Sequence, residues 1–264
     1  MARPFDALSP QRRRLVVGLL VGVGALVLAL VATTVVRGLT RGGPVPQDQP
    51  GPVLLVPGYG GRTASLDPLA AVLRAEGRDV TVVSLLGDGT GDLDAQAAHL
   101  ADVADDVLRT SGAPSVDVVG YSAGGVVVRL WVRDHGGGEQ ARRVLTLGSP
   151  QHGTSVAALG AQVAGGCPTA CEQLLPDSAL LRRLNAGDET PAGPEWATVR
   201  SGADQVVTPT GSAALAGALN VLVQDVCPTA TTSHYALPAD PVVAATVRST
   251  LGAGPPAAPA TGCG

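Results

Sequence analysis

The sequence of 264 residues predicts an α/β fold, in which a mainly parallel sheet of about six strands carries helices on both faces. Two observations predict this fold. Short apolar runs alternate along the chain with amphipathic stretches of helical period, and Gly-containing turns separate them. The apolar runs also lack polar alternation, which indicates strands that are buried on both faces, as parallel strands under helices are. The length suits one mid-sized domain with additional terminal segments.

Each element follows from its own pattern. Apolar runs predict strands at residues 53–56, 79–84, 115–119, 143–147, 197–200 and 220–223. Amphipathic stretches predict helices at residues 66–75, 92–109, 125–134, 154–163, 178–184 and 241–251. Asp92 is expected to cap its helix, because an Asp side chain accepts hydrogen bonds from the first free N–H groups. Parallel sheets of this kind bind ligands beyond the carboxyl ends of their strands, so a site is expected in the loops there.

The N-terminal part predicts a membrane anchor. Residues 15–36 carry no charge, and as a helix they would span about 33 Å, enough for a hydrocarbon core of ~30 Å. Arg12, Arg13 and Arg14 precede this run and favour a cytoplasmic N-terminus. The run is longer than the apolar core of a cleavable signal peptide, so an uncleaved signal anchor is favoured over a cleaved segment. Either alternative places the body of the chain outside the cytoplasm.

The expected organisation therefore has five parts. They are a cytoplasmic N-terminus (1–14), a transmembrane anchor (15–36), a Pro- and Gly-rich linker (37–51), the α/β domain (52–251) and a Pro/Ala/Gly tail (252–264). Residues 52–264 contain 12 Arg, no Lys and 20 acidic residues, so this body is acidic. It lacks the basic surface that nucleic-acid binding requires, and nucleic acid is not an expected partner. The six aromatic residues are too few for a stacking surface, which favours aliphatic acyl groups over glycans as ligands.

The four cysteines favour disulfide bonds. An even number of cysteines in an oxidising compartment predicts two disulfides, for which three connectivities are possible. Pairing of Cys167 with Cys171 and of Cys227 with Cys263 is favoured, because the Gly- and Pro-flanked segment C-P-T-A-C could close on itself. A metal site is disfavoured, since no His lies near these cysteines at ligand spacing.

The pentapeptide G-Y-S-A-G at residues 120–124 is the main chemical motif. It follows the apolar run at 115–119 and precedes a helical stretch. A strand, G-x-S-x-G and a helix form a sharp turn that presents the serine, here Ser122, in a strained conformation. Small residues two positions to either side avoid a clash in such a turn. The motif alone is weak in a chain with 35 Gly, so its weight depends on the residues that complete a site.

A serine nucleophile needs a histidine base and a carboxylate that orients the histidine. His234 follows the sixth predicted strand and Asp204 follows the fifth, which gives the chain order Ser, acid, His. His152 is the alternative base and Asp225 the alternative acid. His152 leaves less room for an intervening acid, and Asp225 lies in the same loop as His234. We therefore expect Ser122, Asp204 and His234 to be catalytic.

An oxyanion would need two preorganised N–H donors. The N–H of Ala123, directly after the nucleophile, is the first expected donor. The second is expected from the loop P-G-Y-G-G at 57–61, which follows the first strand, and the backbone N–H of Tyr59 is favoured.

These motifs resemble secreted bacterial triacylglycerol lipases and esterases of the α/β-hydrolase superfamily, of the compact kind called lipase class 2. The resemblance runs from about residue 53 to residue 251. It rests on V-L-L-V-P-G-Y-G-G, V-D-V-V-G-Y-S-A-G-G, L-G-S-P-Q-H-G-T, the loop around Asp204 and S-H-Y around His234. It implies an α/β-hydrolase fold and a serine hydrolase of carboxylic esters that uses no metal or organic cofactor. Two positions depart from the family: the oxyanion loop begins Pro-Gly instead of His-Gly, and Tyr121 replaces a His beside the serine.

The expected function is a carboxylester hydrolase that acts outside the cytoplasmic membrane through an acyl-enzyme. Its expected partners are a lipid or small ester and, through the N-terminal helix, the membrane, and we expect a monomer. Two alternatives remain open. An acyltransferase of envelope lipids would use the same three residues, and a non-catalytic envelope protein could be built on the same scaffold.

Overall fold

The computed structural model describes residues 10–40, 45–157 and 167–263. The chain divides into two compact units, Met1–Gly43 and Pro44–Gly264. The described part of the first unit is helix α1 (Pro10–Thr40). Within the described ranges, no helix combines the length and apolar character that a membrane crossing needs. The predicted anchor at 15–36 lies within α1 and is not shown to span a membrane, so it stays a prediction from the sequence. Residues 1–9 and 41–44 of its flanking segments lie outside the described ranges.

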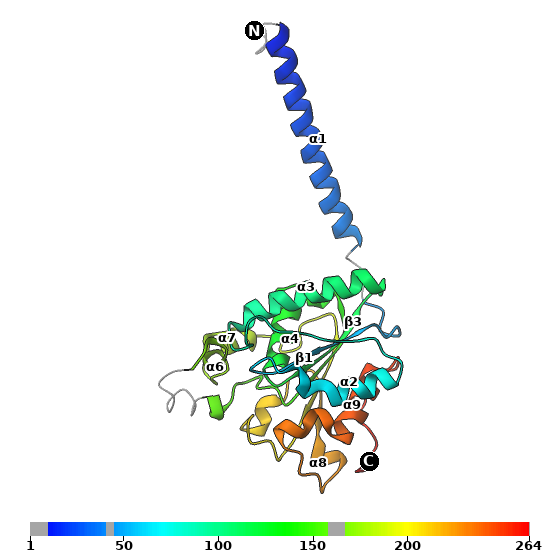
Figure 1. Cartoon of the computed structure of the whole chain (residues 1–264), viewed down its shortest axis with the longest axis vertical. Helices are drawn as coiled ribbons and strands as arrows, with labels where there is room; N and C mark the ends of the chain where they lie inside the picture. Colours follow the sequence, from blue (N-terminus) through cyan, green and yellow to red (C-terminus); the bar gives the residue numbers. More distant parts are fainter. Residues whose placement is uncertain (1–9, 41–44, 158–166, 264) are drawn as a thin grey trace. The chain divides into compact units, whose positions relative to one another are not determined.

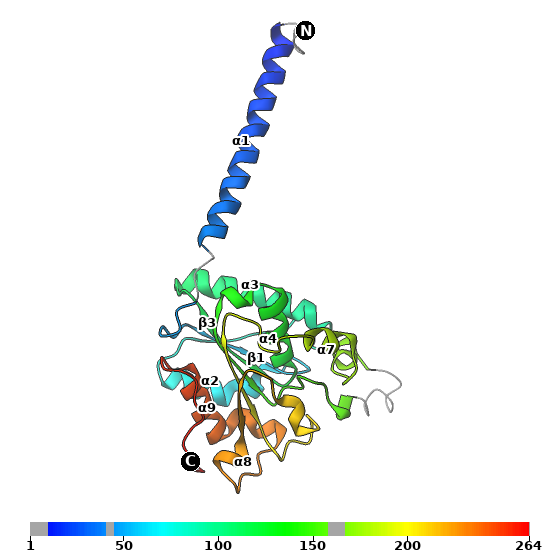
Figure 2. The same cartoon turned by 180° about the vertical axis from the view of Figure 1, so that it is seen from behind.

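The second unit is built around a six-stranded parallel sheet (Figures 1 and 2). Its strands, in chain order, are β1 (Val53–Val56), β2 (Val80–Val82), β3 (Val116–Tyr121), β4 (Ala141–Leu147), β5 (Glu195–Arg200) and β6 (Leu219–Leu222). Their order across the sheet is β2-β1-β3-β4-β5-β6, and every neighbouring pair is parallel. The predicted parallel sheet of six strands is confirmed.

Helices connect the strands. The α-helices are α2 (Asp67–Ala75), α3 (Leu93–Ser111), α4 (Ala123–Asp134), α6 (Thr169–Gln173), α7 (Ala179–Leu184), α8 (Val223–Val226) and α9 (Pro241–Leu251). Short 3₁₀ turns are η1 (Thr63–Leu66), η2 (Gly137–Glu139), η3 (Thr210–Ala213) and η4 (His234–Ala239). The predicted cap is confirmed: the Asp92 carboxylate accepts a hydrogen bond from the Ala95 N–H at 2.9 Å, and α3 then runs to Gly112, whose φ is 68°.

The sheet separates two apolar cores. Successive side chains of a strand point to opposite faces, so Leu54 and Val56 of β1 join one core while Val53 and Leu55 join the other. Helices α3 and α4 cover the first face, and α2 and α9 cover the second (Figure 1). Burial on both faces explains why the strands read as continuous apolar runs.

Strands β4 and β5 begin two residues earlier than the sequence predicted. β4 starts at Ala141 and includes the charged pair Arg142 and Arg143, and β5 starts at Glu195. The prediction missed these ends because it relied on apolar runs. Of the helix predicted at 154–163, residues 155–157 are helical and residues 158–163 lie outside the described part of the chain.

Buried charges explain the early start of β4. Arg142 and Asp117 are fully buried. Arg142 donates two hydrogen bonds to Asp117, from Nε to Oδ1 at 2.8 Å and from Nη2 to Oδ2 at 2.7 Å. The Arg78 guanidinium lies 2.5 Å from the same Oδ2. Arg142 also donates to the backbone carbonyls of Gln47 and Gly252, both at 2.8 Å. This cluster therefore ties the segment before β1 and the residue after α9 to the first residues of β3 and β4. These residues lie at the end of the sheet opposite Ser122.

Candidate active site

Ser122 lies in a sharp turn between β3 and α4. It has φ 53° and ψ −128°, and it is the one residue other than glycine with a positive φ in the described ranges. A Cβ on Gly120 would lie 2.6 Å from the Gly125 Cα, and a Cβ on Gly124 would overlap the carbonyl oxygens of Val56 and Pro57. The two glycines of G-Y-S-A-G are thus required by the close approach of β3, α4 and β1. The turn stores strain that the surrounding packing supports.

The structure brings the three predicted residues together in a hydrogen-bonded row. The Nε2 atom of His234 lies 3.0 Å from the Ser122 Oγ, and its Nδ1 lies 2.7 Å from Oδ2 of Asp204. The other carboxylate oxygen of Asp204 accepts hydrogen bonds from the N–H groups of Val206 and Val207 at 2.8 and 2.9 Å. The side chains of Asp204 and His234 are buried. The arrangement can hold the imidazole with one ring nitrogen facing the serine hydroxyl.

The two expected oxyanion donors flank Ser122. Ala123 is the first residue of α4, so its N–H has no acceptor within the helix. The Tyr59 N–H forms no hydrogen bond with any described residue. Gly58 packs directly against the nucleophile, because a Cβ on it would lie 2.8 Å from the Ser122 Cβ. The loop after β1 therefore borders the space in front of the serine oxygen.

Comparisons with known proteins agree with the fold of the second unit. A family model described as alpha/beta hydrolase fold matches residues 51–162. Aspergillus fumigatus lipase B is similar to the chain, with a TM-score of 0.67 and 19% identity over 78% of this chain and 54% of the lipase. The mature Bacillus licheniformis lipase BlEst2 gives a TM-score of 0.57 and 20% identity over 68% of this chain and 84% of that one. The chain has the alpha/beta hydrolase fold.

The same hydrolase fold occurs in the Listeria innocua lin2722 product, at a TM-score of 0.57 and 16% identity over 77% of this chain and 94% of that one. At this level of identity the likenesses establish the fold alone. The chain spans about half of the Aspergillus lipase, 54% of its length. Its sequence has no match among curated proteins. The resemblance is thus confirmed at the level of a hydrolase fold with lipase structural neighbours, and its bacterial, secreted and class 2 details stay predictions.

Within the hydrolase fold, the alternative site residues lie elsewhere. The Nε2 atom of His152 lies 2.7 Å from Glu189 Oε1, and its Nδ1 lies 3.2 Å from the Ser212 carbonyl oxygen. Burial acts to raise the pKa of Glu189, but hydrogen bonds from the Ala216 N–H and from His152 lower it below the usual value. Asp225 lies exposed in α8. The structure brings neither alternative residue into hydrogen-bond contact with Ser122.

Two residues around the histidine were missed as site residues. The Tyr121 hydroxyl donates a hydrogen bond to the His234 carbonyl at 3.2 Å, and the two ring centroids are 5.2 Å apart. Gly148 follows β4 with φ 51°, and a Cβ there would lie 3.1 Å from Asp204 Oδ2 and 3.3 Å from His234 Nδ1. The available sequence signal for Gly148 was its position directly after a buried strand, in L-G-S-P.

Two cavities adjoin Ser122. One, of about 460 Å³, contains Ser122 and His234 and is lined also by Tyr59, Arg62 and Tyr235. The other, of about 210 Å³, shares Tyr59 and Ser122 with the first. Its remaining described lining is mainly apolar: Pro150, Thr154, Val156, Ala157, Cys171, Leu174, Val206 and Val207. An extended ligand that reaches the serine could therefore place one end in each cavity.

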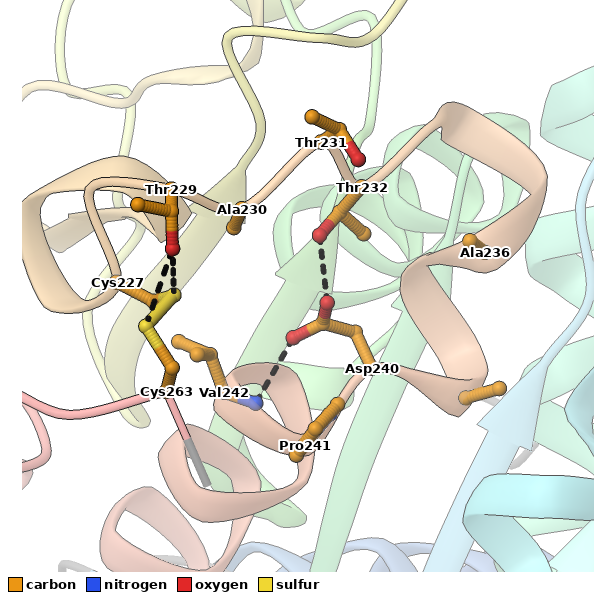
Figure 3. A pocket seen from close by; sticks show the side chains of 11 residues that line it. Cys227, Thr229, Ala230, Thr231, Thr232, Ala236, Asp240, Pro241, Val242 and Cys263 are labelled. Carbon is orange, nitrogen blue, oxygen red and sulfur yellow. Dashed lines mark hydrogen bonds between the residues drawn. A yellow bond between two sulfur atoms is a disulfide. The ribbon is translucent and has the colours of Figure 1, made fainter.

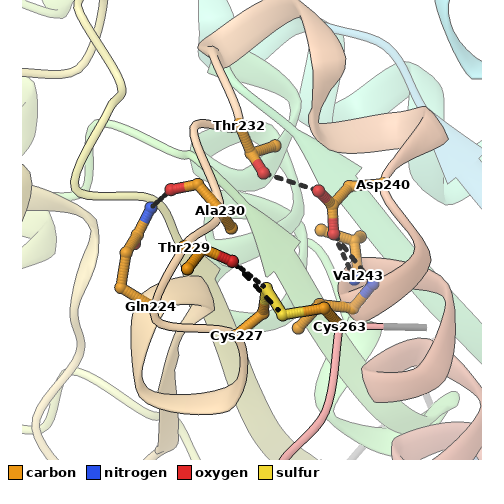
Figure 4. The surroundings of a disulfide bond; sticks show 9 residues. Gln224, Cys227, Thr229, Ala230, Thr232, Asp240, Val243 and Cys263 are labelled. Atoms are coloured by element: carbon orange, nitrogen blue, oxygen red, sulfur yellow. Dashed lines mark hydrogen bonds between the residues drawn. A yellow bond between two sulfur atoms is a disulfide. The ribbon is translucent and has the colours of Figure 1, made fainter.

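The four cysteines form the two favoured disulfides, Cys167–Cys171 and Cys227–Cys263. The first contributes Cys171 to the wall of the smaller cavity. The second fixes the C-terminal tail beside the loop that leads to His234 (Figure 4), and the Gly262 N–H bonds the Val226 carbonyl at 2.9 Å.

A third hollow lies beside this second disulfide, in the surface of the hydrolase fold (Figure 3). Its central contact joins the Thr232 hydroxyl to Asp240, at 2.5 Å. Asp240 also caps α9 by accepting from the N–H groups of Val242 and Val243. These contacts hold the loop before His234 against α9. Because the Asp240 carboxylate already has these partners, we assign the hollow a structural role.

Proposed function

We propose that the protein is a serine carboxylester hydrolase, a lipase or esterase, that works through an acyl-enzyme. The observation that carries the proposal is the row from Asp204 through His234 to Ser122, with bonds of 2.7 and 3.0 Å, next to a strained serine. The hydrolase fold and its lipase neighbours support the same chemistry.

In the first half of the reaction, Ser122 Oγ attacks the ester carbonyl carbon and His234 Nε2 takes the hydroxyl proton. Asp204 holds the imidazole in the required tautomer and stabilises its positive charge. The N–H groups of Tyr59 and Ala123 bind the oxyanion, a contribution of ~3 kcal/mol to the barrier for each donor of this kind. The carbon–oxygen bond to the alcohol then breaks, and the alcohol leaves with the proton from His234.

In the second half, water attacks the acyl-enzyme. His234 takes a proton from the water, the bond between the acyl carbon and Ser122 Oγ breaks, and His234 returns the proton to the serine. The products are the carboxylic acid and the regenerated enzyme. The chain, the ester and one water molecule are sufficient to balance these steps.

We also propose that this reaction takes place outside the cytoplasm and that the chain acts as a monomer. Two disulfides support an oxidising compartment. The predicted signal anchor would deliver the unit of residues 44–264 to that side. Fractionation of cells that express the full chain, with protease treatment of intact cells, tests the location.

A fluorophosphonate probe tests the proposed chemistry, because it labels an activated serine covalently. We expect labelling of the wild type, none of Ser122→Ala, and strongly slowed labelling of His234→Ala. Ser155→Ala is the matched control, since Ser155 bonds Thr208 and lies outside the row. Absence of labelling in the wild type, or equal labelling of Ser122→Ala, would contradict the proposal.

Turnover then defines the reaction. A series of p-nitrophenyl esters with acyl chains of increasing length measures kcat/KM, and a short-chain optimum favours an esterase over a lipase. Product analysis with and without an added acceptor alcohol distinguishes hydrolysis from acyl transfer.

A further inference from the structure

Arg62 lines the larger of the two cavities at Ser122. Among the described residues of that lining it is the one with a permanent charge, and no carboxylate is among them. The side chain is exposed, and its guanidinium makes no hydrogen bond or ion pair with any described residue. Its backbone is held in place, because the Ser65 hydroxyl donates to the Arg62 carbonyl at 2.6 Å. Among the described residues this cation is thus unpaired, and it lines the cavity that contains the nucleophile.

The electrostatic surroundings make this cation distinctive. Residues 52–264 carry 20 acidic residues against 12 Arg, so the body repels anions in general. Asp88 is near enough to raise the pKa of Tyr59, after the larger effect of burial. Its carboxylate, however, already accepts hydrogen bonds from the N–H and hydroxyl of Thr90, at 3.0 and 2.6 Å. The described contacts of the Asp88 carboxylate therefore do not include Arg62.

The smaller cavity has the opposite character. Its described lining carries no charged side chain, and Pro150, Leu174 and Val207 contribute apolar surface. Burial of an aliphatic chain there is favoured, because each CH₂ group leaves water for apolar surroundings. Ser122 stands where the two cavities meet, as the carbonyl carbon of an ester stands between its acyl chain and its alcohol.

We propose that the site takes esters of aliphatic acids whose alcohol carries a negative charge, and that Arg62 is the residue that selects this charge. The acyl chain enters the smaller cavity, and the anionic group of the alcohol lies against the Arg62 guanidinium in the larger one. This inference rests on the proposed ester hydrolysis and names the substrate class of that site.

The test compares two soluble butyrate esters, of 4-hydroxybenzenesulfonate and of the uncharged 4-hydroxybenzenesulfonamide. The measured quantity is the ratio of their kcat/KM values. The intrinsic reactivity of the two leaving groups is the same for the wild type and for every variant, so it cancels when their ratios are compared. A change in the ratio therefore reports recognition of charge. We expect Arg62→Gln to lower the ratio about two- to fivefold, the range of an exposed ion pair, and Arg62→Glu to lower it further. Added salt should lower the wild-type ratio toward that of Arg62→Gln.

Arg109→Gln is the control, since Arg109 is also exposed and pairs with Asp106 away from both cavities. It should leave the ratio unchanged. A comparison of dibutyryl phosphatidylglycerol with dibutyryl phosphatidylcholine repeats the test with lipid headgroups. An Arg62 effect in this lipid pair alone assigns a lipid headgroup as the anionic group. An Arg62 effect in the aryl pair alone assigns a small soluble ester. Equal ratios in the wild type and Arg62→Gln for both pairs, with turnover intact, would overturn the inference alone. If the wild type hydrolysed none of these esters, that result would instead overturn the proposed function.

Discussion

The Tyr121 hydroxyl donates a hydrogen bond to the backbone carbonyl of His234, so the residue before the nucleophile holds the residue proposed as its base. Burial raises the pKa of this phenol well above its usual value, and the hydroxyl stays protonated and able to donate at any ordinary pH. The bond links the turn after β3 to the start of η4. These two segments are 113 residues apart in the chain.

Tyr121→Phe should therefore lower kcat while it leaves KM nearly unchanged. The loss of one hydrogen bond of about 0.5–1.5 kcal/mol loosens His234, which corresponds to a decrease of about two- to tenfold. The rate of fluorophosphonate labelling should fall by the same factor. Tyr235→Phe is the control, because Tyr235 packs edge-on against the His234 ring and is 80% exposed. Equal effects of the two substitutions would contradict a positioning role for the Tyr121 hydroxyl.

Gly124→Ala should disrupt the turn that carries Ser122. The added methyl group would overlap the backbone carbonyl oxygens of Val56, the last residue of β1, and of Pro57, and these cannot move independently of the strand. We expect a loss of about 1–3 kcal/mol in the free energy of unfolding, typical of overpacking, and the loss of most esterase activity. Urea denaturation and p-nitrophenyl ester turnover measure the two effects. Gly91→Ala, where a Cβ would meet no atom within 4 Å, should change neither.

The fold and the arrangement of Ser122, Asp204 and His234 could be predicted from the sequence for a definite physical reason. Parallel strands buried on both faces produce continuous apolar runs, and the loops that follow them converge at one edge of the sheet. The residues that were missed act through distant contacts. The hydrogen bond of Tyr121 and the buried pair of Asp117 and Arg142 leave no local pattern, because each partner is known only once the chain is folded.

Asp117→Asn should destabilise the protein strongly without direct damage to the site. It leaves the fully buried Arg142 without its charged partner, which typically costs about 3–5 kcal/mol of unfolding free energy. Activity per folded molecule should persist, because Asp117 lies at the end of β3 remote from Ser122. Asp106→Asn, which breaks the exposed pair with Arg109, should cost less than about 1 kcal/mol. Similar losses for the two variants would contradict the importance of the buried pair.

Glu189 should give the protein a pH-dependent contribution to stability. Its pKa is lower in the folded chain than in the unfolded one, so the stabilisation is present above the unfolded value, about 4.3, and is lost as the pH falls through the folded value. The difference in unfolding free energy between the wild type and Glu189→Gln should thus be present near neutral pH and should shrink as the pH falls below about 4.3 and through the folded pKa of Glu189. A difference that grows on acidification would contradict the assignment.

The Cys227–Cys263 disulfide should stabilise the protein more than Cys167–Cys171 does. The first closes a separation of 36 residues and the second a separation of 4, and loop-closure entropy gives about 4 and about 2 kcal/mol respectively. Thermal unfolding of the two double Cys→Ser variants measures the difference. An equal decrease in Tm would show that the long loop is already ordered without its disulfide.

The Arg142 guanidinium donates to carbonyl groups from the segment before β1 and from the residue directly after α9, those of Gln47 and Gly252. Those two carbonyls must therefore lie within a few ångströms of one another, since one side chain reaches both. One buried guanidinium thus closes the backbone from residue 47 to residue 252 into a ring without a covalent bond. Fraying of either segment would leave a donor of this guanidinium without its acceptor, so we expect the two segments to stay ordered together or to come loose together.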